Sequence, residues 1–202
     1  MYHIKEKTVY ELEVKKSRFI AVLLPVQDES EAKELLSAVK KAYPNATHYC
    51  TAMIVGNIQR SNDDGEPSGT AGLPMLECLR HHDLHNVLAV VVRYFGGTLL
   101  GTGGLVKAYQ SAVNGAIDKA TLTQPTLMHQ YTVKVPYDMN NKVEQLLRNN
   151  AIITQTDYQE DITYEFLCEE DLTPQFLAIS SGQLVPEFQQ DIIYEKDIKT
   201  QS

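Results

Sequence analysis

The hydrophobic pattern of this 202-residue chain falls into two separate series of strands and helices, and this division restricts the fold more than any other feature. In the first series, strands are predicted where apolar residues alternate or form a short unbroken run, and helices where they recur every three to four residues. The predicted order is ββαβαβα, with strands at 8–14, 18–26, 47–55 and 86–95 and helices at 30–43, 73–82 and 104–121. Ser30 is expected to cap the first helix, and 56–72 is expected to be a long polar loop.

The second series begins after the segment LTQPTLMHQ at 122–130, which has little periodicity, contains Pro125 and is expected to be a linker. The order predicted after this segment is βαββαβ, the split plan of ferredoxin-like domains. Its strands are expected at 131–137, 151–159, 162–170 and 187–195 and its helices at 139–149 and 171–182. The chain is therefore expected to form two α+β domains, residues 1–125 and 126–202.

Charge divides at about the same place. Residues 1–127 contain 13 basic and 13 acidic residues, whereas residues 128–202 contain 5 and 13, which accounts for the whole net charge of −8. An acidic segment repels phosphate, so any contact with RNA is expected in the first domain. Basic residues available there are Lys15, Lys16, Arg18, Arg60, Arg80, Arg93 and Lys107.

Cysteine usage and hydropathy indicate the compartment. The three cysteines are far apart and form no CxxC pair, as is typical of free thiols in a reducing compartment. The first residues carry charges where a signal peptide needs an apolar core, and the apolar runs are much shorter than a membrane span. A cytoplasmic location with no membrane partner is expected.

Two glycine-rich segments are the candidates for function: DDGEPSGTAG at 63–72 and GGTLLGTGG at 96–104. Each precedes a predicted helix, whose free N–H groups and partial positive charge favour an anion. Arg93, at the end of a strand, adds a guanidinium that can bind an anion through two hydrogen bonds. The alternative is structural: the glycines serve turns and close packing, and Arg93 pairs with Asp63, Asp64 or Glu66.

Other chemistries find less support in the sequence. The sequence contains none of the motifs that bind nucleotides or metals: GxxxxGK[ST], GxGxxG in its required context, HExxH or CxxC. No nucleotide cofactor or metal is therefore expected. His81, His82 and His85 near Asp83 are more typical of a polar surface than of a metal site. Acid/base candidates are Asp63, Asp64, Glu66 and His48, but no nucleophile elbow or triad accompanies them, and catalysis is therefore the less favoured reading.

The sequence closely resembles the IMPACT family. The resemblance covers the whole chain and is carried by KKSRF, ATHYC, DDGEPSGTAG and MLECLRHHDLHNVLAVVVRYFGGTLLG, in which Arg93, Tyr94, Phe95, Gly96 and Gly97, followed by Gly101, form the family's signature. Bacterial members are short two-domain proteins of this length. The resemblance implies an N-terminal domain similar to the second domain of ribosomal protein S5 and a ferredoxin-like C-terminal domain similar to the last domain of elongation factor G.

The resemblance also implies a binding surface, which we call the Gly/Arg face. Its residues are Asp63, Asp64, Glu66, Ser68, Thr70, Arg93, Gly96, Gly97, Gly101, Gly103, Gly104 and Lys107. Lys107 stands where many relatives have arginine, so a bidentate role there is in doubt. Eukaryotic members act in translational control by binding the activator of a starvation-responsive kinase. That role is not carried over, because the additional N-terminal domain of those members has no counterpart in this sequence and bacteria lack the kinase pathway.

Two classes of function remain open. The favoured one is a non-catalytic module for translation regulation or stress response that contacts RNA, the ribosome or a ribosome-associated protein through the Gly/Arg face. The alternative is a small-molecule or phosphate-binding enzyme that uses the same loops, since the S5-like fold also occurs in small-molecule kinases. Both rest partly on analogy of fold.

Overall fold

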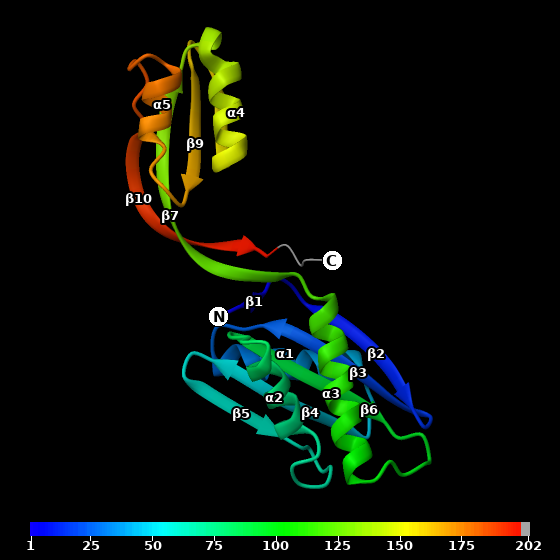
Figure 1. Ribbon diagram of the computed structural model, residues 1–202. Helices are drawn as coiled ribbons and strands as arrows, with labels where there is room; N and C mark the ends of the chain where they lie inside the picture. Colours follow the sequence, from blue (N-terminus) through cyan, green and yellow to red (C-terminus); the bar gives the residue numbers. More distant parts are fainter. Residues whose placement is uncertain (199–202) are drawn as a thin grey trace. The chain divides into compact units, whose positions relative to one another are not determined.

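The computed structural model describes residues 1–198 and shows an α+β protein with two sheets (Figure 1). Its contacts divide the chain into two compact units. Unit 1 contains residues 1–124 and 197–198, and unit 2 contains Pro125–Lys196. In the described part of the chain, no helix is both long and apolar enough to cross a membrane.

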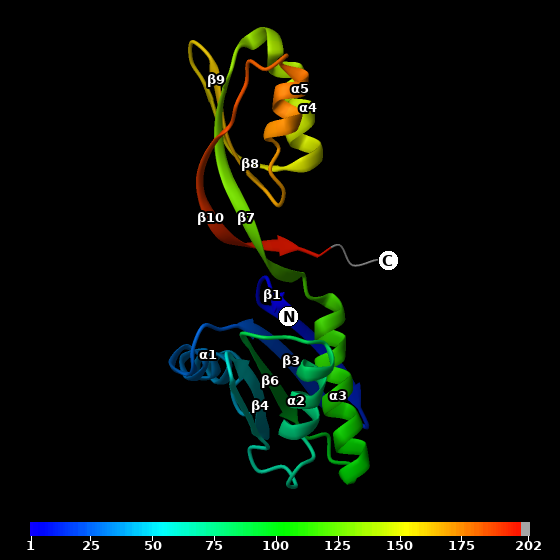
Figure 2. The same ribbon diagram turned by 60° about the vertical axis from the view of Figure 1, so that its left-hand side comes forward.

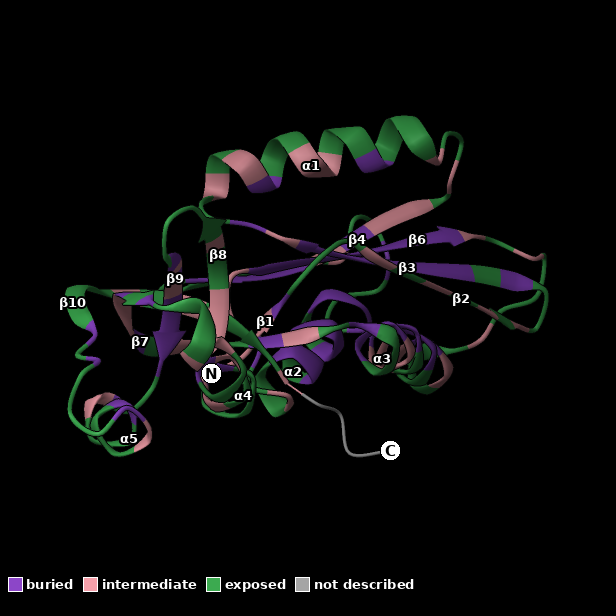
Figure 3. Cartoon of the chain, turned by 90° about the horizontal axis from the view of Figure 1, so that it is seen from above, coloured by how far each residue is buried: buried purple, intermediate pink, exposed green. Residues whose placement is uncertain are grey.

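Unit 1 is built on an antiparallel sheet with the strand order β2-β3-β6-β4-β5. The strands are β2 (Thr8–Val14), β3 (Ser17–Pro25), β4 (His48–Val55), β5 (Ile58–Asn62) and β6 (Val87–Tyr94). Figure 3 shows α1 (Glu29–Ala42) on one side of this sheet and α2 (Gly72–His81) and α3 (Thr102–Lys119) on the other. Both faces of the sheet are therefore covered, which explains the unbroken apolar run of β6.

The two faces of the sheet have separate cores. Alternate residues of β6, such as Val90 and Val92, pack under α1 with Val39. The residues between them, such as Val91, face α2 and α3 together with Tyr109. This alternation assigns each side chain of β6 to one face, and it places Arg93 on the face of α2 and α3.

The cap of α1 differs from the prediction. Asp28, not Ser30, is the N-cap residue, and its Oδ1 accepts hydrogen bonds from the amides of Ser30 and Glu31 at 2.8 and 2.9 Å. Asp and Ser are similarly good caps, and the apolar pattern defines the start of a helix only to within about two residues.

Two short strands of unit 1 were not predicted. The expected loop 56–72 begins with β5, which forms a hairpin with β4 through a two-residue turn that includes Gly56 at φ +53°. Every residue of β5 is exposed, so the strand has no hydrophobic alternation to reveal it. The other strand, β1 (His3–Ile4), has only two residues.

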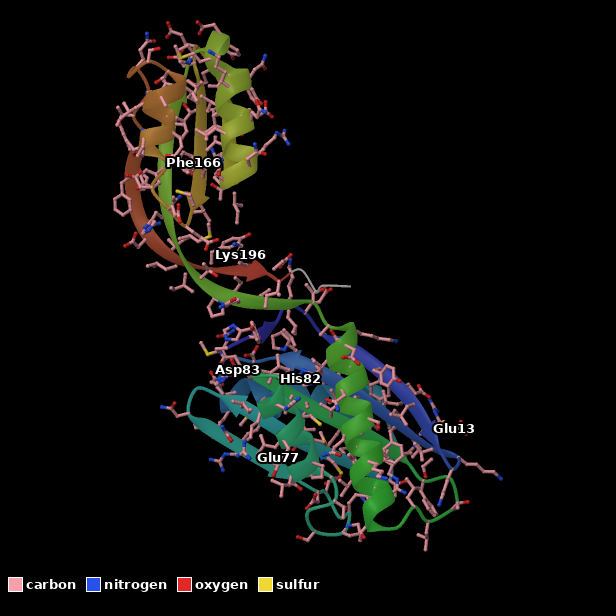
Figure 4. All side chains as sticks on the ribbon, in the orientation of Figure 1. Glu13, Glu77, His82, Asp83, Phe166 and Lys196 are labelled. Atoms are coloured by element: carbon pink, nitrogen blue, oxygen red, sulfur yellow. The ribbon has the colours of Figure 1, made fainter. Side chains whose placement is uncertain are left out.

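Unit 2 has the predicted element order βαββαβ. It comprises β7 (Leu122–Val135), α4 (Asn140–Asn150), β8 (Ile152–Tyr158), β9 (Ile162–Cys168), α5 (Thr173–Ile179) and β10 (Glu187–Asp197), with a short 3-10 helix at Tyr137–Met139. The strand order is β10-β7-β9-β8, and both helices lie on one side of the sheet (Figure 2). Phe166, labelled in Figure 4, is buried between the stacked rings of Tyr131 and Phe176.

Residues 122–130 were expected to be an irregular linker but form the first part of β7. The division between the two units nevertheless falls within this segment, between Gln124 and Pro125. Leu122 and Thr123 pair with β1, and residues from His129 onward pair with β9. Pro125 lies between these two paired stretches, where its missing N–H interrupts neither ladder. A proline that reads as a loop signal is therefore compatible with a continuous strand here.

Candidate functional site

Strand register brings three side chains together at one end of the unit 1 sheet. Phe19 on β3 and His48 on β4 are both register partners of Arg93 on β6. Because directly opposed residues point to the same face, all three side chains lie on the side of α2 and α3. The Arg93 guanidinium lies 5.3 Å from the centre of the Phe19 ring.

Arg93 forms a buried ion pair with Glu66. Nη1 donates to Glu66 Oε1 at 2.5 Å, and the two side chains are only 6% and 3% exposed. The hydroxyl of Tyr109 donates to the same Oε1 at 2.8 Å, and burial raises the pKa of Tyr109, so it stays protonated as a donor. The structural alternative considered above thus holds for Glu66, and no ion pair joins Arg93 to Asp63 or Asp64 among the described residues.

Asp63 organises the first glycine-rich loop. Its carboxylate accepts hydrogen bonds from the amides of Gly69, Ala71 and Gly72 at 2.8, 3.0 and 2.8 Å. Burial alone would raise the pKa of Asp63, but these three amides outweigh burial and lower it. The amides at the start of α2 are therefore occupied by the chain's own carboxylate and are not free for an external anion.

Asp64 and His48 fix each other. The amide of Tyr49 donates to Asp64 Oδ2 at 2.7 Å, and His48 Nδ1 lies 2.7 Å from the Asp64 carbonyl oxygen. A carbonyl only accepts, so Nδ1 carries the hydrogen, and in the neutral ring Nε2 is left as an acceptor. That Nε2 lies 3.9 Å from Glu66 Oε2.

The remaining residues of the Gly/Arg face have separate roles. Thr70 is buried and donates through Oγ1 to the carbonyl of Pro67 at 2.6 Å, whereas Ser68 and Lys107 are exposed. A Cβ on Gly96 would lie 2.0 Å from the backbone of Lys16, so a close approach of two backbones requires glycine there. Gly97 and Gly101 have positive φ angles of +82° and +74°, a backbone conformation that favours glycine, whereas Gly103 and Gly104 do not. A Cβ on Gly103 would meet no atom within 4 Å.

The two loops enclose a pocket of about 420 Å³, which we call the Arg93 pocket. It is lined mainly by apolar atoms, and its lining residues are Thr47, His48, Glu66, Pro67, Arg93, Phe95, Leu99, Leu100, Gly101, Thr102 and Leu105. Phe95 and Leu99 on its rim are 46% and 81% exposed. Exposed apolar side chains around a pocket are typical of a binding surface.

The pocket contains only part of the predicted site. Glu66, Arg93 and Gly101 line it, whereas the other residues of the Gly/Arg face do not. Sequence reasoning did not single out Leu99, Leu100 and Leu105 as site residues. Leu99 and Leu100 could have been noticed because they are adjacent leucines inside a glycine-rich loop, where no helical or strand periodicity accounts for apolar residues.

The histidines near the end of α2 have other partners. His82 Nε2 lies 3.2 Å from Asn114 Oδ1, and His85 lies 3.4 Å from Asp83, which also pairs with the N-terminal amine. Figure 4 labels His82 and Asp83. Within residues 1–198, no three His, Cys, Asp or Glu side chains are grouped so that they could hold a metal ion.

Comparison with known proteins identifies the family. The model of the Impact N-terminal domain matches residues 15–117, which is more than half of the chain and includes the whole Arg93 pocket. The chain belongs to the IMPACT family. A second family model, a domain of unknown function (DUF1949), matches residues 133–178 in unit 2.

Similar IMPACT proteins are found in other bacteria. IMPACT family member YvyE of Bacillus subtilis (strain 168) is 40% identical over 179 residues, covering 87% of this chain and 82% of that protein. IMPACT family member YigZ of Escherichia coli (strain K12) is 43% identical over 153 residues, covering 73% and 75%. A crystal structure described as a hypothetical protein aligns with a TM-score of 0.60 at 34% identity, over 92% of this chain and 95% of that chain.

Proposed function

We propose that this IMPACT family member is a non-catalytic binding module of the translation machinery in the cytoplasm, and that the Arg93 pocket is its contact surface. The observation that carries the proposal is an apolar-lined pocket with the exposed side chains of Phe95 and Leu99 on its rim. Large exposed apolar groups beside a concave surface favour contact with a partner.

Of the partners expected from the sequence, a ribosome-associated protein fits this surface better than RNA. Phosphate binding requires cations that are free to release counterions. The charge of Arg93 is instead matched by Glu66, and the amides at the start of α2 are occupied by Asp63. The contact is therefore proposed to be mainly apolar, with RNA binding as the competing outcome.

The association with translation rests on the family resemblance and on analogy of fold. The same resemblance supports assigning unit 1 to the fold of the second domain of ribosomal protein S5 and unit 2 to that of the last domain of elongation factor G. The order β10-β7-β9-β8 with two helices on one face supports the ferredoxin-like part of this assignment. The acidic charge of unit 2 argues against RNA contact there.

One observation favours the enzyme alternative. His48 is oriented by the Asp64 carbonyl and leaves Nε2 as a base in a pocket that also contains Glu66 and Arg93. If the protein is an enzyme, a panel of nucleotides and phosphorylated metabolites should contain one compound that specifically raises the melting temperature. A binding module should show no such shift.

Cosedimentation with ribosomes tests the proposed module directly. Leu99→Glu places a charge on the pocket rim without disturbing a buried group, because Leu99 is 81% exposed. Val185→Glu in unit 2 makes the same change at another exposed apolar residue and serves as the control. We expect Leu99→Glu to weaken ribosome or partner binding by more than about tenfold and Val185→Glu to leave it unchanged. Equal binding by both variants would reject the Arg93 pocket as the contact surface.

A further inference from the structure

The guanidinium of Arg93 has unused hydrogen-bonding capacity at the Arg93 pocket. Its hydrogen bond to Glu66 is made by Nη1, whereas Nε is enclosed and has no partner among the described residues. An enclosed donor without an acceptor is unfavourable, and native proteins rarely retain one without a reason. An acceptor supplied from outside the chain would remove this cost.

The side-chain charges at the pocket favour an uncharged acceptor, although the N-terminus of α3, which has no side-chain cap, also reaches the pocket. The charges of Arg93 and Glu66 balance each other. An anion entering the pocket would meet the Glu66 carboxylate, and a cation would meet Arg93. Both would also lose their hydration among mainly apolar atoms. An uncharged acceptor such as a carbonyl oxygen avoids these costs.

The walls of the pocket suit an apolar group. Phe95, Leu99 and Leu100 come from the loop before α3, and Leu105 comes from its second turn. Phe95 also covers the guanidinium, with its ring centre 5.6 Å from Arg93 Cζ. The Phe95 ring is half exposed, and a change of its side-chain rotamer is the movement that access to Nε requires in this inference.

We infer that the Arg93 pocket receives an uncharged, mainly apolar side chain of a protein partner, whose adjoining carbonyl oxygen accepts a hydrogen bond from Arg93 Nε. The inference rests on the proposed function and specifies the chemistry of the group that is bound. Charge complementarity favours a neutral peptide segment over a phosphate-bearing ligand, since the charge of Arg93 is already matched by Glu66.

A matched set of small probes tests this chemistry on the full chain. The probes are N-acetyl-phenylalaninamide, which is neutral and has carbonyl acceptors; N-acetyl-phenylalanine, which is an anion; phenethylamine, which is a cation without an acceptor; and adenosine, a neutral nucleoside. Binding is followed by the NMR signals of the arginine Nε–H groups, with that of Arg93 assigned by its loss in Arg93→Lys. We expect N-acetyl-phenylalaninamide to shift the Arg93 signal in a saturable way, with an affinity in the millimolar range and at least about fivefold tighter than for the other three probes.

Two variants connect the result to the pocket. Arg93→Lys keeps a cation opposite Glu66 but removes Nε, and Leu99→Ala shortens a wall residue that is 81% exposed. Each should weaken N-acetyl-phenylalaninamide at least about threefold, measured by the ligand signals, whereas Val185→Ala should not change its binding. If Arg93→Lys does not fold, Leu99→Ala and the four probes still show whether the pocket prefers a neutral ligand.

The outcomes separate this inference from the proposed function. Preference for N-acetyl-phenylalanine or adenosine, equal binding of all four probes, or no binding would overturn the inference. Leu99-dependent cosedimentation with ribosomes could still be observed in these cases and would support the proposed function alone. Probe binding as expected, without any cosedimentation, would support the pocket chemistry and contradict the role in translation.

Discussion

Arg93 Nη1 and Glu66 Oε1 lie 2.5 Å apart in an ion pair that joins strand β6 to the DDGEPSGTAG loop and is almost closed to solvent. Arg93 is thereby held in place by a carboxylate 27 positions earlier in the chain. The pair matches the charge of Arg93 within a pocket whose lining is mainly apolar.

Breaking this pair from the carboxylate side should be costly. Glu66→Gln leaves the Arg93 charge buried without a counter-charge, so we expect the free energy of unfolding to fall by about 3 kcal/mol. The double variant Glu66→Gln/Arg93→Met removes both charges and should recover most of this loss. Urea denaturation of the full chain measures the free energy of unfolding of each variant. Glu11→Gln, which breaks the exposed ion pair with Arg18, is the control and should lower this free energy much less. A loss below 1 kcal/mol would contradict the assigned burial of the pair.

Asp63 should make unit 1 sensitive to acid. Its folded pKa is lowered, so its stabilisation is fully present above the unfolded pKa of about 4 and is lost as the pH falls through the folded pKa. Asp63→Asn should therefore cost about 1–3 kcal/mol at pH 7, with the difference from wild type narrowing below about pH 4. Thermal melts of both proteins between pH 7 and pH 3 measure the difference, and a gap that does not change with pH would disprove this role of the carboxylate.

The cysteines should not react in the native protein. Burial raises the pKa of Cys50 to about 12, and that of Cys78 and Cys168 to about 11. Since the thiolate is the reactive form, a disulfide reagent at pH 8 should modify none of the three thiols until urea is added. Rapid reaction of one native thiol would show that its surroundings are more open than in the structure.

A fragment of residues 1–125 should fold by itself. It keeps the whole sheet order β2-β3-β6-β4-β5 and the residues of β7 that pair with β1. We expect a soluble fragment with one cooperative thermal transition by circular dichroism, and residues 126–202 provide the parallel test for the other domain. An aggregated or molten 1–125 fragment would contradict independent folding.

The sequence predicted the elements that have a clear apolar pattern and missed those that have none. β6 and α3 have strong apolar patterns, and both lie where they were expected. β5 has five exposed residues and β1 has only two residues, so neither has a pattern to detect. The first part of β7 contains a proline, which is a turn signal in sequence. Its compatibility with the sheet depends on where the pairing of β1 and β9 leaves a gap.

The sequence indicated which residues come together in the candidate site but not how they pair. The two glycine-rich loops and Arg93 lie at the same end of unit 1, and their role in binding stays a prediction. Asp63 accepts hydrogen bonds from three amides, and Glu66 pairs with Arg93. Both contacts depend on the path of the loop, which no local sequence pattern reveals. Leu99 and Leu100 line the Arg93 pocket because the loop folds back toward His48 and Arg93, and such long-range closure leaves no periodic signal.

The central claim, that the Arg93 pocket contacts a protein of the translation machinery, is tested most directly by site-specific photocrosslinking in cells. A benzophenone amino acid in place of Leu99 lies on the pocket rim, and the same group in place of Val185 is the control at an exposed residue of unit 2. We predict a discrete protein adduct from position 99 that sediments with ribosomes, is lost in an Arg93→Ala variant whose fold is verified by circular dichroism, and does not form from position 185. Adducts to RNA alone, or equal adducts from both positions, would contradict the account.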